Sequence, residues 1–390
     1  MKGFEEALKC VEAPAKPANR LYYLALSPSL YEPTILNLRA TGMARDPEAW
    51  RRVVIEKPFG ADLASAQALN KSIHSVFTED EVFRIDHYLG KETVQNILVL
   101  RFANTIFEPV WNRNYTDNVQ ITVAETVDLA DRAGYYNQAG VFRDMFQNHI
   151  LQLLTVAAME PPSNFQAELL CNENVKVLNA VRRVTRESAP EIAVAAQYDG
   201  YLGEPGVHND SHTLTYAAVR IDIDNWRWQD VPFYLRSGKA LDDKRTAIVI
   251  QFPRPPHLMF PQEIFLNILA IQVQPDAGIH IEFQAKTPDE KMDLRHVDLE
   301  FHYDDSFGRQ DILDTCERLL LDAKNGDASL FTCSDEIEEA WEIMDPIIQG
   351  LATPDAQPIS SYAKGSEGPD EADRFLAKYG HKWLNRNWQH

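Results

Sequence analysis

The feature that most constrains this chain is a series of apolar runs that each end in polar, chemically reactive residues. Three such runs occupy residues 21–26, 51–56 and 82–86. The two segments between them carry helical signals, with a Ser29-x-x-Glu32 capping box in the first and Asp62 as an N-cap in the second. Strands that alternate with helices form a parallel sheet, so the start of the chain is predicted to be β-α-β-α-β.

Parallel strands bring their carboxyl ends to one edge of the sheet, where open α/β folds bind ligands. The residues that follow the three runs are Ser27, Lys57, Asp86, His87, Tyr88 and Lys91. The lysines suit a phosphate group, and the carboxylate and imidazole suit proton transfer. Each lysine taken alone is more often a solvated surface residue, and only its place after an apolar run favours a binding role.

The composition is ordinary for a soluble globular protein, and 390 residues favour two domains. The formal net charge of −20 argues against binding nucleic acid or anionic membranes, so a phosphate site must be a local cluster of cations. Neither a membrane span nor a secretory signal is found, and we expect a cytoplasmic protein. The four cysteines, Cys10, Cys171, Cys316 and Cys333, lie far apart and are expected to be reduced thiols.

The pattern changes after residue 118. Residues 119–125 alternate as in a half-buried strand, and a helix is predicted from Gln138 to Met159. Alternating runs without intervening helices then cover 212–223, 231–236, 246–252, 266–274, 279–285 and 296–302. This succession predicts a mainly antiparallel sheet in an α+β domain. Helices are expected at 308–325 and 334–350, and an irregular tail at 352–372.

The predicted fold class is therefore α/β plus α+β, with a partial Rossmann-like parallel sheet followed by a large sheet with helices. Residues 1–86 are assigned to an incomplete dinucleotide-binding domain and residues 87–390 to a domain for substrate binding and dimerisation. A dinucleotide domain normally opens with a strand, a glycine-rich turn and a helix, and no such turn precedes residue 21. The glycine-dense segment 200–206 has the wrong spacing and is predicted to be a loop.

Four segments of the chain form longer motifs: Glu56-Lys57-Pro58-Phe59-Gly60, Arg84-Ile85-Asp86-His87-Tyr88-Leu89-Gly90-Lys91-Glu92, Arg143-Asp144-Met145-Phe146-Gln147-Asn148-His149 and Val231-Pro232-Phe233-Tyr234-Leu235-Arg236-Ser237-Gly238-Lys239. In these segments the chain closely resembles the glucose-6-phosphate dehydrogenase family. The resemblance extends over the chain from about residue 19. It implies oxidation of glucose 6-phosphate at C1 to a lactone, with hydride transfer to NADP, in the pentose phosphate pathway. The family's N-terminal GxxGxLA-type turn is absent, so we expect an N-terminally short member.

The resemblance implies His149 as the catalytic base and Asp86 as its partner. An imidazole suits this role because its ordinary pKa of about 6.5 lies near working pH. From its helix alone, His149 is more often a core histidine than a base. Asp144 is expected about 140° around an α-helix from His149, so that the two residues cannot share one narrow stripe but could both border the same pocket.

The remaining site residues also follow from the resemblance. Those implied for sugar phosphate are Lys57, His87, Tyr88, Lys91, Glu125, Asp144, Lys239 and Lys244, and those implied for the cofactor are Ser27, Pro28, Tyr31 and Lys57. The cofactor is expected to be NADP, with NAD possible because the segment that discriminates between them is missing. A second, structural NADP near 266–285, where Leu266, His280 and Glu282 lie, is not expected. The expected partners are glucose 6-phosphate and further copies of the chain, as a homodimer or homotetramer.

Two other functions stay open at this point. One is a truncated, redox-inactive protein that binds sugar phosphate or acts as a scaffold, which the missing glycine-rich turn would suit. The other is a related sugar dehydrogenase that uses NAD. A coding sequence upstream of Met1 that adds a strand and a GxxGxLA turn would favour the dehydrogenase.

Overall fold

The computed structural model describes residues 2–12, 17–129, 133–260, 264–288, 292–308, 315–351 and 359–384. The chain forms two compact units. Unit 1 comprises Met1–Lys91, Glu160–Leu178 and Leu313–Asp345, and unit 2 comprises Glu92–Met159, Asn179–Ile312 and Pro346–His390. Neither unit is continuous in sequence, whereas the expected domains were divided at residue 86. That division stays a prediction.

Unit 1 is built on a three-stranded parallel sheet in the order β1-β2-β3, as the alternation of apolar runs predicts. Its strands are β1 (Arg20–Leu24), β2 (Arg51–Ile55) and β3 (Val82–Arg84). Its helices are α1 (Lys2–Val11), α2 (Tyr31–Ala40), α3 (Leu63–His74) and α10 (Thr315–Asn325), and its 3-10 turns are η1 (Pro28–Leu30) and η2 (Glu79–Glu81). Two further helices, α7 (Ala167–Ala180) and α11 (Ser334–Leu351), begin in unit 1 and end in unit 2. Val54, Phe83 and Leu319 form its buried core, so α10 packs on this sheet.

Local capping agrees with the sequence at α3 but not at α2. The Asp62 carboxylate accepts a hydrogen bond from Ser65 N–H at 2.8 Å, and Ser65 completes a capping box. The predicted Ser29–Glu32 box is wrong, because helix α2 begins after the turn η1 and has no side-chain cap. Glu32 instead accepts a hydrogen bond from Ser72 at 2.7 Å.

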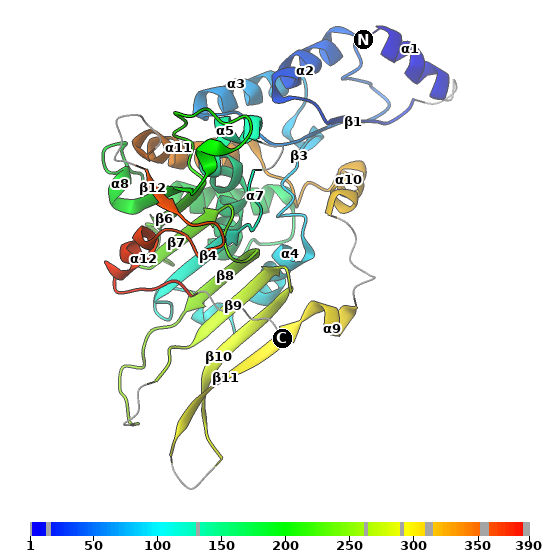
Figure 1. The fold of residues 1–390 in the computed structure, drawn as a ribbon. Helices are drawn as coiled ribbons and strands as arrows, with labels where there is room; N and C mark the ends of the chain where they lie inside the picture. The colour runs from blue at the N-terminus through cyan, green and yellow to red at the C-terminus, as the bar shows by residue number, and fades with distance from the viewer. Residues whose placement is uncertain are drawn as a thin grey trace. The chain divides into compact units, whose positions relative to one another are not determined.

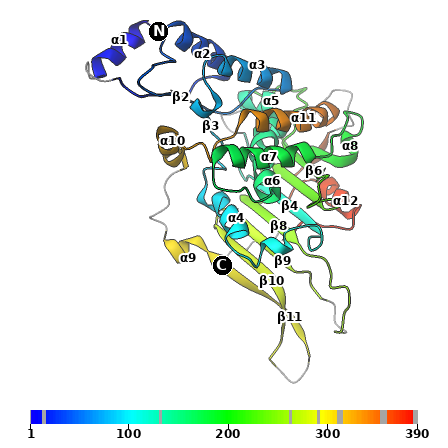
Figure 2. The same ribbon diagram turned by 180° about the vertical axis from the view of Figure 1, so that it is seen from behind.

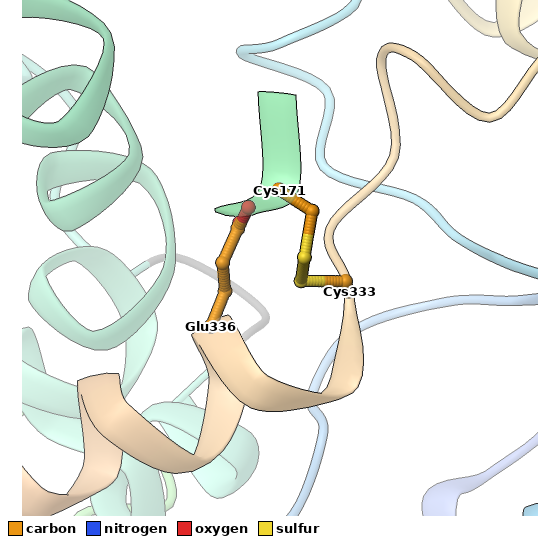
Figure 3. A group of neighbouring side chains, drawn as sticks. All are labelled: Cys171, Cys333 and Glu336. Atoms are coloured by element: carbon orange, nitrogen blue, oxygen red, sulfur yellow. A yellow bond between two sulfur atoms is a disulfide. The ribbon is translucent and has the colours of Figure 1, made fainter. Parts of the chain in front are cut away.

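The prediction that all four cysteines are reduced is wrong for two of them. Cys171 in α7 and Cys333, which directly precedes α11, form a disulfide (Figure 3). Beside it, Asn174 donates a hydrogen bond to the Glu336 carboxylate at 2.9 Å. The two cysteines are 162 residues apart in sequence, and only the return of both segments to unit 1 brings them together.

Unit 2 contains a nine-stranded sheet in the order β11-β10-β9-β8-β4-β7-β6-β5-β12, which Figure 1 shows from β11 to β6. The neighbours are antiparallel except for the parallel pairs β4–β7 and β5–β12. The strands are β4 (Asn118–Ala124), β5 (Ala193–Tyr198), β6 (Tyr216–Asp222), β7 (Pro232–Gly238), β8 (Arg245–Gln251), β9 (Ile268–Gln274), β10 (Gly278–Lys286), β11 (Leu294–His302) and β12 (Ser360–Tyr362). The predicted mainly antiparallel sheet is confirmed.

Helices cover this sheet, and Figure 2 shows α4 and α6 lying across one of its faces. The helical elements of unit 2 include α4 (Glu92–Phe102), α5 (Ala133–Val141), α6 (Leu151–Ala158), α8 (Ala189–Ile192), α9 (Tyr303–Phe307), α12 (Asp370–Ala377) and the 3-10 turns η3 (Glu108–Val110) and η6 (Tyr201–Gly203). The glycine-dense segment after β5 is a turn with no long helix, as predicted. The tail is more regular than expected, with β12 and the start of α12 inside it, while 352–358 lie outside the described residues. No helix in the described part of the chain is long and apolar enough to span a membrane.

The predicted helix from Gln138 to Met159 is three segments instead of one. Helix α5 ends at a kink at Gly140, where φ is 61°, and the π-helix η5 (Phe142–Ile150) follows before α6. A Cβ at position 140 would lie 3.3 Å from the Thr213 side chain, so glycine allows both the left-handed backbone and the close approach. π-Helical segments are rare and occur frequently at functional sites.

Buried donors hold the end of α6. The last carbonyl groups of an α-helix have no partner within the helix. Here the Trp111 indole donates to Ala157 O at 2.7 Å and the Trp228 indole to Ala158 O at 2.8 Å. Arg101 donates to Val156 O at 3.0 Å and to Met159 O at 2.7 Å. These bonds anchor the helix that continues directly from η5.

Replacing Trp228 by Phe should lower the free energy of unfolding of unit 2 by about 1–3 kcal/mol, because Ala158 O is then buried without its donor. Trp226→Phe is the matched control, since Trp226 is 95% exposed, and it should change stability by less than about 0.5 kcal/mol. Urea unfolding followed by circular dichroism measures both. Equal effects of the two substitutions would contradict an anchoring role for the indole N–H group.

Candidate active site

The first cluster of predicted residues lies at the carboxyl edge of the parallel sheet in unit 1. Because β1, β2 and β3 are parallel, the residues that follow them lie at the same edge. These are Ser27, Lys57, Asp86 and His87. The predicted parallel pairing of the three runs is therefore confirmed, and the convergence of these residues on one binding crevice stays a prediction.

Glu56 is at the centre of this cluster, although the sequence did not single it out as a site residue. Its carboxylate accepts a hydrogen bond from the Tyr23 hydroxyl at 2.6 Å and lies 3.5 Å from His87 Nε2. The Tyr31 hydroxyl donates to Glu56 O at 2.9 Å. The available signal was its position, since it directly follows β2 and precedes Lys57.

The contact between Glu56 and His87 changes the acidity of both groups. Glu56 raises the pKa of His87 above its ordinary value, against the opposing effect of burial. Proximity of His87 and the hydrogen bond from Tyr23 lower the pKa of Glu56. A protonated His87 carries a positive charge, which suits an anionic oxygen, while its Nε2 faces Glu56 and its Nδ1 lies 3.6 Å from Cys316 Sγ.

The loop after β3 holds the remaining residues of this cluster. The Asp86 carboxylate is 3% exposed and accepts a hydrogen bond from Tyr88 N–H at 2.7 Å. Lys91 N–H donates to Tyr88 O at 3.1 Å, and Lys91 Nζ lies 4.3 Å from the centroid of the Tyr88 ring. A Cβ on Gly90 would lie 2.6 Å from Thr315 of α10, so this turn requires glycine. This loop therefore places the imidazole of His87, the phenol of Tyr88 and the ammonium group of Lys91 close together in the chain.

The residues predicted for the cofactor differ in how far they are exposed at this edge. Ser27 is exposed, and its hydroxyl lies 3.2 Å from that of Ser29. Tyr31 is 1% exposed, so its ring supports β2 rather than lying open at the surface. Pro28 opens the turn η1, and Lys57 is half-buried after β2. The cofactor roles of these residues stay predictions.

The second cluster lies in unit 2, where β4 and β7 run parallel and end together. Glu125 and Lys239 directly follow these strands, and Lys239 Nζ lies 2.7 Å from Glu125 Oε2. Lys244 is exposed and precedes β8, whose first residue pairs with the last residue of β4. Ala240, next to Lys239, has a φ of 52°, an uncommon conformation for alanine that is often seen near functional sites. Three of the predicted sugar-phosphate residues therefore lie at one sheet edge.

The π-helix η5 carries Asp144 and His149 and packs against β4 and β7. The predicted separation of about 140° between these residues is wrong, because it assumed α-helical geometry. In a π-helix residues i and i+5 follow each other after about one turn, so Asp144 and His149 lie on nearly the same face. His149 is 4% exposed.

Tyr136 is a second residue that the sequence did not indicate. It is 2% exposed, and Lys239 Nζ lies 5.0 Å from the centroid of its ring. Burial raises the pKa of Tyr136 well above its ordinary value, and the negative charges of Asp144 and Glu125 add to this effect. The charges of these two carboxylates therefore act on one buried phenol, beside the lysine.

The two clusters can supply complementary chemistry. The first offers an imidazole with a raised pKa, a lysine and a phenol, which are suitable donors for phosphate oxygens. The second offers carboxylates and a lysine for hydroxyl groups and a buried imidazole as a proton acceptor. Asp86 belongs to unit 1 and His149 to unit 2, so their predicted partnership stays a prediction.

Comparisons with known proteins agree on one family. The profile described as "Glucose-6-phosphate dehydrogenase, NAD binding domain" matches residues 1–96, and "Glucose-6-phosphate dehydrogenase, C-terminal domain" matches residues 98–384. Glucose-6-phosphate 1-dehydrogenase of Aggregatibacter actinomycetemcomitans is 44% identical over 375 residues, which is 94% of this chain and 75% of the relative. Glucose-6-phosphate 1-dehydrogenase 2 of Mycobacterium bovis is 45% identical over 383 residues, covering 94% of this chain and 73% of the relative.

Solved structures give the same result. A glucose-6-phosphate dehydrogenase in complex with its substrate glucose-6-phosphate has a TM-score of 0.89 and 36% identity, covering 98% of this chain and 79% of that one. Glucose-6-phosphate 1-dehydrogenase from Mycobacterium avium has a TM-score of 0.86 and 36% identity, covering 100% and 81%.

Replacing Glu56 by Gln should lower the pKa of His87, because the carboxylate that raises it is lost. In the unmodified protein the contact stabilises the fold below the unfolded-state pKa of about 6.5, and this contribution is lost as pH rises through the folded-state pKa. Histidine NMR titration measures the shift directly. His74→Asn removes an imidazole that contacts Glu79 instead of Glu56 and should leave the pKa of His87 unchanged. An unchanged pKa in Glu56→Gln would exclude Glu56 as the cause.

Proposed function

Because the chain belongs to the glucose-6-phosphate dehydrogenase family, we propose that it oxidises glucose 6-phosphate at C1 to the lactone and uses NADP. The observation that carries this proposal is the similarity to a family member in complex with glucose 6-phosphate, which extends over 98% of the chain. The reaction would serve the oxidative pentose phosphate pathway. The relatives named above are all dehydrogenases, which favours this function over a redox-inactive binding or scaffold protein.

The residues of unit 1 suit the phosphate group of the substrate. His87 carries positive charge to higher pH than an ordinary imidazole because of Glu56, and Lys91 adds a permanent cation. Tyr88 contributes a hydroxyl donor beside Lys91. The chain has a net charge of −20, and such a local cluster of cations offsets the repulsion that an anionic substrate would otherwise meet.

The residues of unit 2 suit the sugar ring and the proton transfer. Glu125, Asp144 and Lys239 offer acceptors and donors for ring hydroxyls. His149 accepts the proton of the C1 hydroxyl as the C1 hydrogen leaves with its electron pair, and a C1=O bond forms. From the family resemblance we propose Asp86 as the carboxylate that supports the base, the role that a carboxylate has in triads.

The described residues fit a nicotinamide dinucleotide in part. When bound, NADP supplies the acceptor for the hydride. Ser27, Pro28 and Lys57 follow parallel strands, which is the usual position of residues that line such a cofactor, whereas the buried Tyr31 supports this edge through its hydrogen bond to Glu56 O. No glycine-rich turn that would hold the pyrophosphate occurs at the start of a described helix. We assign NADP from the family, and the ratio of kcat/KM for NADP and NAD decides between them.

We also propose that the chain forms a homodimer through the large sheet, as a dimer or within a tetramer. Support comes from the apolar face of β10 and β11, the strands at one edge of the sheet. Their alternation places Ile279, Ile281, Phe283, Val297, Leu299 and Phe301 on one face. Leu299 is 58% exposed, so part of this face is uncovered in a single chain.

His149→Asn should lower kcat for glucose 6-phosphate by at least about 100-fold, because no other described group is assigned to accept the C1 hydroxyl proton. NADPH formation at 340 nm measures this, with glucose in place of glucose 6-phosphate as a test of phosphate recognition. His208→Asn, at an exposed position, is the control and should keep normal turnover. Undiminished turnover in a folded His149→Asn protein would remove His149 as the base.

Leu299→Asp should shift the protein toward monomer, since a charge on an apolar interface must be desolvated on association. Light scattering after gel filtration measures the mass across a range of concentrations. Asp298→Asn alters the other face of the same strand and serves as the control. If Leu299→Asp has the same mass as the parent protein at every concentration, this face is not the interface.

A further inference from the structure

One face of β10 and β11 is mainly polar: apart from Gly278 and Leu294, its side chains can bind metal or form hydrogen bonds. Strand β11 alternates between His296, Asp298, Glu300 and His302 on this face and apolar residues on the other. The register of the two strands places His280 opposite Glu300 and Gly278 opposite His302. Two groups of three ligand-type side chains result. They are His280, Glu300 and His302, and then Glu282, His296 and Asp298.

The ligand atoms of the first group have a spacing close to that of a metal site. His280 Nδ1 lies 3.8 Å from Glu300 Oε1, and His302 Nε2 lies 3.6 Å from Glu300 Oε2. A tetrahedral ion with bonds of about 2.0–2.1 Å holds its ligand atoms about 3.3 Å apart. Small side-chain rotations would therefore bring the three ligand atoms to bonding distance around one ion.

The second group is less suited to an ion. His296 Nε2 lies 2.9 Å from Glu282 Oε2, a direct hydrogen bond that closes the space an ion would need. The third member, Asp298, lies 3.8 Å from the same nitrogen. The described geometry thus distinguishes a directly hydrogen-bonded pair in the second group from the wider ligand spacing of the first group.

Exposure to solvent does not by itself explain why polar residues occupy the positions of the first group. Edge strands commonly carry charged residues that prevent pairing with other chains, and this explains the exposed Glu300. It does not explain His280, whose side chain is 0% exposed. A Cβ on Gly278 would lie 2.6 Å from Phe301 O, so the close pairing with β11 favours glycine here, and both imidazoles lie beside this position, with His302 Nδ1 at 3.5 Å and His280 Nε2 at 3.6 Å from it. Their ring centroids are 5.2 Å apart.

We propose that His280, Glu300 and His302 bind a divalent cation of the zinc class. Two imidazoles and one carboxylate are a ligand set that zinc accepts, with a fourth position left for water. The strands supply all three ligands, and the ion would link the edge strand β11 to its neighbour β10. The site is separate from the residues assigned to the dehydrogenase reaction and does not depend on that assignment.

The test is zinc binding by the full chain after removal of metal with a chelator. We expect about one equivalent of Zn²⁺ per chain after gel filtration. Cobalt(II) in place of zinc should give visible bands without sulfur-to-metal charge transfer, which excludes the exposed thiols Cys10 and Cys316 as the ligands. Less than about 0.2 equivalents of zinc, or a thiolate band, would overturn the proposal.

Variants identify the ligands. His302→Asn and Glu300→Gln should each raise the Kd for zinc by about 100-fold or more. Even the loss of a residue that only supports a ligand lowers metal affinity by about 10–100-fold. His296→Asn on the same face and His74→Asn at an exposed imidazole–carboxylate pair are controls and should keep the site. Loss of binding in His296→Asn with retention in His302→Asn would overturn the assignment.

The two substituted ligands are partly exposed, and circular dichroism checks that each variant protein is folded. The zinc stoichiometry and cobalt spectrum of the unmodified chain test the proposal independently of any variant.

Discussion

Parallel pairing of strands is the constraint on which both candidate clusters depend. In unit 1 the pairing of β1, β2 and β3 collects polar residues at one edge, with Glu56 between Tyr23 and His87. In unit 2 the pair β4–β7 does the same for Glu125 and Lys239 in a sheet that is otherwise mostly antiparallel. A strand that reversed direction would carry its terminal side chain to the opposite edge.

Helix geometry adds what strand direction does not supply. The π-helix η5 brings Asp144 and His149 to nearly one face beside β4 and β7. The adjoining helix α6 is held by buried indole and guanidinium donors on its terminal carbonyl groups. These donors come from α4, from the segment before β4 and from the segment before β7. The position of the proposed base therefore depends on hydrogen bonds remote from it in sequence.

The strands β10 and β11 show how a single alternation can serve two purposes. Their apolar face suits association with another chain, and their polar face gathers imidazoles and carboxylates. Because side chains of a strand alternate strictly, each face can take on its own chemistry. The polar face differs from an ordinary solvated surface in that His280 and Glu282 are fully buried.

The sequence by itself determined the alternation of strands and helices, the residues at strand ends and the family. These follow from local periodicity and from contiguous motifs such as Arg84 to Glu92, which do not depend on distant contacts. Only the tertiary structure decided the disulfide between Cys171 and Cys333, the role of Glu56 at the centre of its cluster and the π-helical turn that carries His149. Each of these depends on partners distant in the chain or on a helix type whose periodicity the α-helical pattern conceals. Local sequence patterns therefore predicted which residues matter, and long-range packing decided how they are arranged.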